Sequence, residues 1–316
     1  MHRYVIKRLL QLIPVIIGVS FMIFFIMDLA PGTVVDLIAP DDATTEQIKE
    51  LEHKYGYDRS VFYRYGLYMK NLLQGDMGVS YLTNKPVFDS YMERLPYTAR
   101  LGLCAFLLSL VMSIPLGITA ATHAGSIRDN VSMVLALAGL SMPNFWLGLL
   151  LIIAFALKLH WFPSFGAEDG WKSLVLPAIT IGTGQMASMT RTTRSSMLDV
   201  IRSDYLRTAR AKGVSEKVVI QKHALRNALI PIITIAGNQL GGMFGGAVLT
   251  ETVFAYPGIG RMKIDAVNQR DTNMVTGAIL LTTCGISFLL LCVDLTYAMV
   301  DPRLKSMYAK KKKGGN

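Results

Sequence analysis

The sequence predicts an all-α, polytopic membrane protein that crosses a lipid bilayer six times. Three observations support this prediction: 52% of the 316 residues are apolar, the mean hydropathy is +0.38, and the charged residues are concentrated between long apolar runs. This composition excludes an intrinsically disordered chain and argues against an ordinary soluble domain. The net charge of +10 fits an orientation signal in a membrane protein better than it fits nucleic-acid binding. We therefore expect the lipid bilayer, and no nucleic acid, as a partner.

Six stretches are long and apolar enough to span the hydrocarbon core, which needs about 20 residues because it is about 30 Å thick. The predicted spans are residues 9–30, 98–121, 131–157, 173–190, 228–255 and 275–300. The first run is longer than the apolar core of a signal peptide, so we expect an uncleaved anchor. Polar side chains such as Gln185 dilute the fourth run, which should face other helices or a water-filled path rather than lipid.

The distribution of Lys and Arg predicts that both termini face the cytoplasm. With that orientation, 19 of the 32 basic residues lie in the inner connectors 1–8, 122–130, 191–227 and 301–316. Eight of the other 13 lie in the outer stretch 31–100, and a long loop of this kind is translocated largely regardless of its charge. We therefore expect a multi-pass protein with an even number of spans.

The outer segment 31–97 is predicted to form a small helical lobe outside the bilayer. Thr44 begins a capping pattern that continues at helical spacing to His53, and Phe62 to Leu73 form a second short amphipathic helix. The lobe is either a simple cap over the helix ends or a docking surface for a delivery protein. The predicted domains are an N-terminal span (1–30), this lobe (31–97), a core of five spans (98–300) and a basic cytoplasmic tail (301–316).

No group of residues in the sequence is typical of an active site or a metal centre. The phosphate-binding pattern G-x-x-x-x-G-K-[ST] is absent, because Gly241 and Gly246 are followed by Ala247 and Val248. The H-E-x-x-H and G-x-S-x-G patterns are absent too, and the five histidines are scattered. The three cysteines lie within apolar runs without metal-ligand spacing. We expect no catalytic residue, no metal and no cofactor on this chain, so another chain must hydrolyse any ATP.

The basic, helix-prone connector 198–227 is the strongest candidate for a functional site. Residues 199–212 are predicted to form one helix, and its apolar face comprises Leu198, Ile201, Tyr205, Leu206 and Ala209. Gly213 should end this helix and Ser215 should cap a second one. Two short helices bent at a glycine form a compact knob that can fill a groove in a partner. The alternative is a solvated loop that is basic only to fix the topology.

The last two spans contain the candidate residues of a translocation path. Residues 237–246 combine five glycines with two amide side chains, which indicates either close helix packing or a roomy, polar pore wall. The candidate path residues are Asn238, Gln239, Gly242 and the more external Glu251. Asp294 lies within the sixth span, where a carboxylate needs a partner or water. The alternatives for Asp294 are an ion pair with Arg191 or Arg194, a contact with substrate or a gate, and a free interfacial acid.

Several segments, in order along the chain, carry a family resemblance. The strongest are R-T-A-R-A-K-G from Arg207 to Gly213 and H-A-L-R-N-A from His223 to Ala228. The others are Ala30-Pro-Gly32, Ser141-Met-Pro143 with Phe145-Trp146, Thr190 to Met197, Leu249 to Phe254, and Tyr256 to Arg261. Together they resemble the permeases of ABC importers, in particular the B-type permease subunit of the oligopeptide and dipeptide branch. The general pattern has a Glu where this chain has Arg207, so no contact of that carboxylate is carried over.

The resemblance implies a permease subunit of an ATP-driven peptide importer in a bacterial or archaeal cytoplasmic membrane, with the fold of type I importer permeases. It implies a heterodimer with a second, homologous permease, two ATP-binding subunits that use ATP and Mg²⁺, and an extracytoplasmic peptide-binding lipoprotein. The residues expected to couple to the ATP-binding subunits are Tyr205, Leu206, Arg207, Ala209, Arg210, Gly213, His223 and Arg226. Nickel chelates, opines or other small solutes are alternative substrates, and an ATP-independent channel or secondary transporter is the alternative mechanism.

Overall fold

The computed structural model describes residues 2–40 and 42–300, and the predicted basic tail 301–316 lies outside the described residues. The described chain is all-α, and its only β-type contact is an isolated antiparallel bridge between Val79 and Pro86. The chain divides into two compact units, Met1–Thr98 with Pro257–Ser287 and Ala99–Tyr256 with Phe288–Asn316. The long helices α5 and α14 each contribute to both units.

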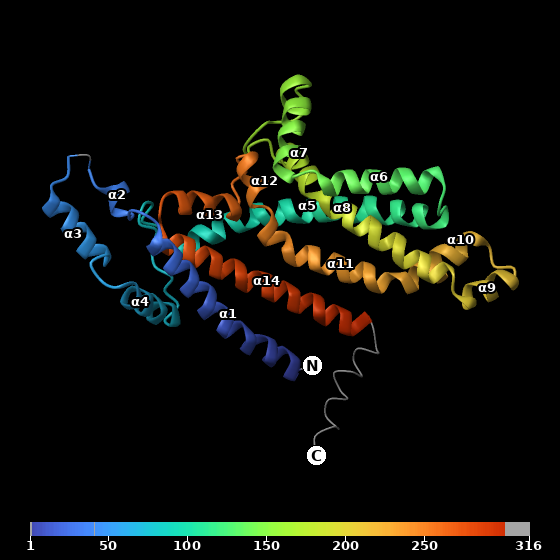
Figure 1. Cartoon of the computed structure of the whole chain (residues 1–316), viewed down its shortest axis with the longest axis horizontal. Helices are drawn as coiled ribbons and strands as arrows, with labels where there is room; N and C mark the ends of the chain where they lie inside the picture. The colour runs from blue at the N-terminus through green and yellow to red at the C-terminus, as the bar shows by residue number, and fades with distance from the viewer. Residues whose placement is uncertain (1, 41, 301–316) are drawn as a thin grey trace, which may run out of the picture. The chain divides into compact units, whose positions relative to one another are not determined.

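The first unit holds the N-terminal helix and the segments that follow it. Its helices are α1 (His2–Leu29), α2 (Val35–Ile38), α3 (Thr45–Tyr55), α4 (Val61–Leu73), α13 (Ile259–Asn268) and the first parts of α5 (Val87–Thr122) and α14 (Thr272–Val300) (Figure 1). The predicted capping box begins α3, because the Thr44 hydroxyl accepts from the Gln47 N–H while the Gln47 side chain accepts from the Thr44 N–H. Gly56, with φ 77°, ends α3. Both helices predicted for the lobe are therefore present.

The second unit is a group of packed helices. It contains α6 (Ile127–Ser141), α7 (Asn144–Leu151), the π-helix η1 (Ile152–Lys158), α8 (Lys172–Ile201), α9 (Asp204–Ala211), α10 (Glu216–Val218), the π-helix η2 (Val219–Ala224), α11 (Leu225–Gly246) and α12 (Val248–Val253). Helix α8 packs against both α6 and α11 (Figure 1). A Cβ added to Gly139 of α6 would lie 2.7 Å from Thr183 of α8, so this glycine permits the close approach of the two helices.

Three described helices are long and apolar enough to cross a membrane, namely Arg8–Leu29, Val87–Thr122 and Thr272–Leu295. Helix α6 and the following α7–η1 qualify only as a pair, and they bend by 102° at the break between them. The predicted span 131–157 is therefore not one continuous helix, and its crossing of the membrane stays a prediction. The bend occurs where Met142, which precedes Pro143, adopts an extended backbone (ψ 126°), as the residue before a proline tends to do.

The predicted fourth and fifth spans are helical, but neither meets the same criteria of length and hydropathy within the described residues. Helix α8 covers the fourth span and carries many buried hydroxyl groups, in keeping with a helix that faces other helices. The fifth span is interrupted, because α11 ends at Gly246 and α12 follows as a separate helix. The all-α membrane-protein fold is confirmed, and the count of six spans stays a prediction.

Candidate functional site

The predicted coupling connector folds into a compact knob between α8 and α11, and we call residues 203–227 the basic knob. The first arm is α9, which begins after Ser203. The prediction of one helix over 199–212 is wrong, because Ser203 is extended (ψ 146°) and its hydroxyl donates to the Val200 carbonyl at 2.5 Å. Serine side chains compete with helical hydrogen bonding in this way. Gly213 follows α9 in the left-handed region (φ 81°), as a glycine that ends a helix should.

The second arm of the knob also differs from the prediction. Ser215 occupies the N-cap position of α10, but its side chain makes no capping hydrogen bond. Helix α10 continues through η2 into α11 without a break, so this arm is the first part of a long helix rather than a separate short one.

The apolar face of α9 packs against the core of its own unit. Leu206 is fully buried, in a cluster with Met197 of α8, Val219 of η2 and Ile232 of α11. Ala209 packs at the edge of the same cluster. Leu206 is therefore not available for direct contact with a partner, and its predicted part in coupling would have to be indirect. Leu206 and Ala209 instead anchor the knob to the ends of the long helices.

Basic and aromatic side chains remain on the exposed surface of the knob. Tyr205 is 45% exposed, and its hydroxyl oxygen accepts a hydrogen bond from Asn227 Nδ2 at 2.8 Å. Arg210 donates to both carboxylate oxygens of Glu216, at 3.0 and 2.9 Å, and this bond lowers the pKa of Glu216. The ion pair joins the two arms across the turn at Gly213. The other predicted coupling residues are partly or fully exposed: Arg207, His223 and Arg226.

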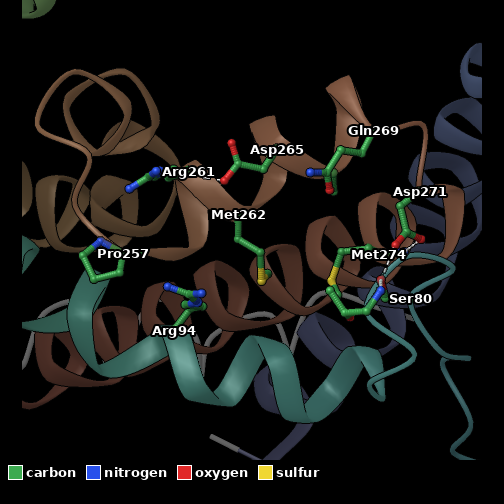
Figure 2. Close-up of a pocket in the computed structure, with 12 residues that line it drawn as sticks. Ser80, Arg94, Pro257, Arg261, Met262, Asp265, Gln269, Asp271 and Met274 are labelled. Atoms are coloured by element: carbon green, nitrogen blue, oxygen red, sulfur yellow. Dashed lines mark hydrogen bonds and ion pairs between the residues drawn. The ribbon is translucent and has the colours of Figure 1, made fainter. Parts of the chain in front are cut away.

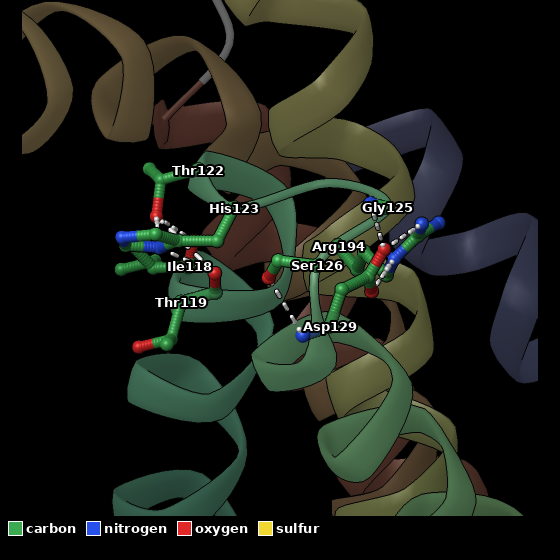
Figure 3. A network of polar contacts seen from close by, with 8 residues as sticks. All are labelled: Ile118, Thr119, Thr122, His123, Gly125, Ser126, Asp129 and Arg194. Carbon is green, nitrogen blue, oxygen red and sulfur yellow. Dashed lines mark hydrogen bonds and ion pairs between the residues drawn. The ribbon is translucent and has the colours of Figure 1, made fainter.

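An ion pair that was not predicted fixes α8 near its knob end (Figure 3). Arg194 Nε and Nη2 donate to Asp129 Oδ1 and Oδ2 at 2.6 and 2.7 Å, and the Gly125 N–H donates to Oδ2 at 2.9 Å. Asp129 is only 3% exposed, so the pair ties the start of α6 firmly to α8. Arg194 was one of the two partners predicted for Asp294. With Arg194 bound to Asp129, the pairing of Asp294 stays a prediction.

The glycine-rich part of α11 serves two different purposes. A Cβ on Gly241 would lie 2.5 Å from Leu290 of α14, so this glycine permits close packing. Gly242 has open space around the position of its missing Cβ. The neighbouring Gln239 donates from Nε2 to the Gln185 backbone carbonyl of α8 at 2.9 Å, and the side-chain oxygens of both glutamines are buried without a hydrogen-bond partner. Gln185 therefore joins the candidate path residues.

The other two predicted path residues differ in exposure. Asn238 is exposed on α11 and is available to a path. Glu251, predicted to lie at a pore entrance, is fully buried on α12. The chain turns at Ala247, and α12 packs against α7 and α8, which places Glu251 in the interior. In this structure Glu251 does not face an open path, and its place at a pore entrance stays a prediction.

A cavity of about 290 Å³ lies beside α13 in the first unit (Figure 2). Its lining includes two arginines, Arg94 and Arg261, and two aspartates, Asp265 and Asp271. Asp271 accepts a hydrogen bond from the Ser80 hydroxyl at 2.5 Å, and burial raises its pKa. Because charges of both signs line the cavity, it does not select for an ion of one sign.

The turn-rich segment 256–260 leads into α13 and is held in place by buried side chains and a hydrogen bond. Tyr256 and Ile259 are 3% and 0% exposed, and the Ile259 N–H donates to the Thr98 hydroxyl at 2.8 Å. Both side chains are buried, so neither is available for contact with a partner.

Two family descriptions match this chain. Residues 113–306 match "Binding-protein-dependent transport system inner membrane component", and residues 1–102 match "Binding-prot-dependent transport system membrane comp, N-term". Together they reach from the first residue past the described end of α14.

Two relatives match nearly their whole length. A dipeptide transport system permease protein of Alkalihalophilus pseudofirmus is 41% identical over 332 residues, which cover 96% of this chain and all of the relative. A glutathione transport system permease protein of Escherichia coli K12 is 39% identical over 305 residues, which cover 96% of this chain and 99% of the relative.

Solved structures share the fold at low sequence identity. An inward-facing structure of the MetNI methionine ABC transporter has a TM-score of 0.57 at 17% identity and covers 67% of this chain and 96% of its own. An amino acid ABC transporter solved with histidines has a TM-score of 0.52 at 13% identity, with coverage of 68% and 94%. The resemblance to ABC importer permeases is thereby confirmed. The chain belongs to the family of binding-protein-dependent transport system inner membrane components.

Proposed function

We propose that this chain is one permease subunit of an ATP-driven importer that carries dipeptides or oligopeptides across the cytoplasmic membrane. The observation that carries the proposal is the match of nearly the whole chain to relatives named for dipeptide and for glutathione transport. Glutathione is a tripeptide, so both names point to short peptides. Nickel chelates and opines are the competing substrates.

The proposed complex contains a second, homologous permease that forms a heterodimer with this chain. Two ATP-binding subunits would dock on the cytoplasmic side, where they would use ATP and Mg²⁺, and a peptide-binding lipoprotein would deliver substrate from outside. This chain would bind no cofactor and contribute no catalytic residue. Both of its termini would face the cytoplasm.

The basic knob is the proposed docking site of one ATP-binding subunit. Its exposed surface presents Tyr205 and Arg207, and Tyr and Arg are enriched among the residues that dominate binding energy at protein interfaces. Asn227 holds the Tyr205 hydroxyl from the second arm, so this ring is preorganised for contact. Arg226 and His223 lie on the second arm and would extend the contact surface.

The anchoring of the knob explains how a docked subunit could move the spans. Leu206 fixes α9 to the core, the Arg210–Glu216 pair joins the two arms, and the second arm is continuous with α11. The Asp129–Arg194 pair extends the same rigid connection to α6. Closure of the ATP-binding subunits would therefore rotate α8 and α11 as one body, which is a common form of conformational switching.

The proposed path uses the amide groups on α8 and α11. The buried oxygens of Gln185 and Gln239 lack donors, and a buried acceptor without a partner is costly. Water or the backbone N–H groups of a peptide would satisfy these oxygens during transport. Neutral amides suit a transporter of varied peptides, since they favour no particular side-chain charge.

Copurification and transport test the proposal together. The tagged chain is isolated from its native membranes in mild detergent, the accompanying chains are identified by mass spectrometry, and the complex is reconstituted into liposomes with ATP and Mg²⁺ on the knob side. We expect a second permease, ATP-binding chains, and ATP-dependent uptake of a labelled dipeptide that unlabelled tripeptides reduce. Uptake without ATP by the isolated chain would favour a channel. Competition by nickel chelates or opines alone would exclude a peptide substrate.

A further inference from the structure

Helix α4 lies beside the body of α1 rather than beyond its end. The Tyr65 hydroxyl of α4 donates to the Ile17 carbonyl of α1 at 3.0 Å. The Phe21 ring packs edge-on against Tyr65, with ring centroids 5.3 Å apart, and stacks on Phe62 at 6.2 Å. Helix α4 therefore follows the middle part of α1.

The depth of these contacts follows from helix geometry. The apolar part of α1 is Arg8–Leu29, and its length of about 33 Å matches a hydrocarbon core of about 30 Å. At 1.5 Å per residue, Phe21 and Ile17 lie about 12 and 18 Å along the axis from Leu29. If α1 spans the bilayer, α4 lies at the depth of the acyl chains and not in the water beyond them.

Helix α4 leaves several large apolar side chains exposed on the side turned away from its own core. The residues packed toward α1 and α14 are Val61, Tyr65, Tyr68, Met69 and Leu72. Beyond these residues, Phe62, Tyr63, Leu67 and Leu73 are 66%, 58%, 49% and 85% exposed, and Phe62 borders α1 through its stack on Phe21. A surface helix in water normally carries polar residues on that side. Lys70 is the one charged residue there, and its long side chain can extend toward the headgroups.

The other charge on α4 is held against the protein. Arg64 forms an ion pair with Asp28 of α1, and its side chain is only 13% exposed. Its guanidinium also lies over the Tyr57 ring, 4.7 Å from the centroid. This arrangement removes the second charge of α4 from the outward face.

The neighbouring α3 has the opposite character. Its sequence, Thr45–Tyr55, contains three glutamates and two lysines and no buried residue. Such a helix is suited to water on nearly every side. The polarity of the lobe therefore changes from one helix to the next, which a lobe held entirely in water would not require.

We propose that α4 is embedded in the leaflet that holds the Leu29 end of α1, with Phe62, Leu67 and Leu73 in contact with lipid acyl chains. With the N-terminus in the cytoplasm, this is the outer leaflet. Lipid is the occupant because α4 packs against the middle of the apolar span Arg8–Leu29, where Met22 and Ile26 are themselves 62% and 57% exposed. The proposal revises the prediction that residues 31–97 all lie outside the bilayer.

Spin-label accessibility tests the proposal on the full chain in its native complex. Cys104, Cys284 and Cys292 are replaced by Ser, and single labels are attached at Leu67→Cys, Leu73→Cys and, as a matched control on α3, Glu50→Cys. The complex is placed in lipid nanodiscs and retained only if ATP-dependent transport persists in liposomes. Collisions with oxygen, which concentrates in lipid, are compared with collisions with chromium oxalate, which stays in water.

We expect the labels at 67 and 73 to collide more with oxygen than with chromium oxalate, and the label at 50 to show the reverse. Chromium oxalate collisions at 67 and 73 equal to those at 50 would overturn the proposal in favour of a lobe in water. Shielding of 67 and 73 from both reagents would overturn it in favour of a protein partner. Neither outcome bears on the importer function, because α4 contributes no residue to the proposed coupling site or path.

Discussion

Helices α9 and α4 are both short and amphipathic, and each buries one face within its own unit. They differ in the face that remains exposed. On α9 this face carries Arg207, Arg210 and the polar ring edge of Tyr205, whereas on α4 it carries Phe62, Leu67 and Leu73. A charged face has to remain in water or meet a polar partner, and an apolar face has to meet lipid or an apolar partner. The buried face thus holds a helix in place, and the exposed face determines its surroundings.

Truncation of a leucine should give the largest difference between the two helices in the free energy of unfolding. Leu206→Ala removes a fully buried side chain from the core beneath the knob, and such substitutions cost about 2–5 kcal/mol. The matched variant Leu67→Ala, on the outward face of α4, should change the free energy of unfolding much less. Thermal unfolding of the reconstituted complex measures both. Equal losses would show that Leu67 is buried by something other than lipid.

Breaking the ion pair between Asp129 and Arg194, which holds α8 to α6, should cause the next largest loss of stability. Arg194→Ala leaves the buried Asp129 carboxylate without its bidentate partner, which we expect to cost about 1.5–3 kcal/mol. The double variant with Asp129→Ala should recover part of this loss, because no unpaired charge remains. A double-mutant cycle on unfolding midpoints measures the coupling. Additive losses would mean that the pair does not connect α6 and α8.

Replacing glycine by alanine should change local stability in opposite directions at two positions. Gly213 has φ 81°, so Gly213→Ala strains the turn of the knob and should destabilise it by about 1 kcal/mol. Gly66 lies within α4 with open space around it, so Gly66→Ala should stabilise α4 by up to about 1 kcal/mol. Local hydrogen exchange in each helix reports the two changes. A stabilising Gly213→Ala would contradict the left-handed turn.

The smallest expected effect is the pH dependence of the knob. The bond from Arg210 lowers the pKa of Glu216 in the folded protein. The ion pair therefore stabilises the knob at pH values above the pKa of Glu216 in the unfolded chain, and this stabilisation is lost as the pH falls through the lowered pKa of the folded state. Both side chains are partly exposed, which limits the contribution to about 0.2–1 kcal/mol. The protection factors of the α9 amides, which correct for the intrinsic pH dependence of exchange, should fall on acidification, and Arg210→Ala should abolish this response.

The local stability around Asp271, in the first unit, should depend on pH in the opposite sense. Burial raises its pKa, so its ionisation disfavours the folded state and local stability falls as the pH rises through that raised value. The protection factors of amides at the start of α14 should therefore decrease as the pH rises in this range. Asp271→Asn removes the titration while keeping an acceptor for the Ser80 hydroxyl, and it should flatten the profile. A profile unchanged by this substitution would contradict the assignment.

Local sequence signals predicted the helices well but not their surroundings. The capping box at Thr44 and the glycine end at Gly213 need only neighbouring residues, and both are present in the structure. The break at Ser203 could have been anticipated, because serine favours an N-cap over a helix interior. The amphipathic pattern of α4 was recognised, but a pattern does not tell which of its two faces meets protein.

Long-range contacts account for the remaining differences between the predictions from the sequence and the structure. Asp129 and Arg194 are 65 residues apart, and no spacing rule links them. Glu251 lay within a predicted continuous span, and its burial follows from the turn at Ala247 and the packing of α12. The burial of Leu206 was not predictable for the same reason, since the cluster around it is built from several helices.

Photocrosslinking in native membranes tests the central contrast most directly. The photoreactive residue p-benzoylphenylalanine is placed at Tyr205 in one variant and at Leu67 in another, and the captured products are identified by mass spectrometry. The expected result is a crosslink from position 205 to an ATP-binding subunit and a crosslink from position 67 to lipid, with no protein. Capture of lipid or of no protein at position 205 would contradict the proposed docking of ATP-binding subunits on the basic knob.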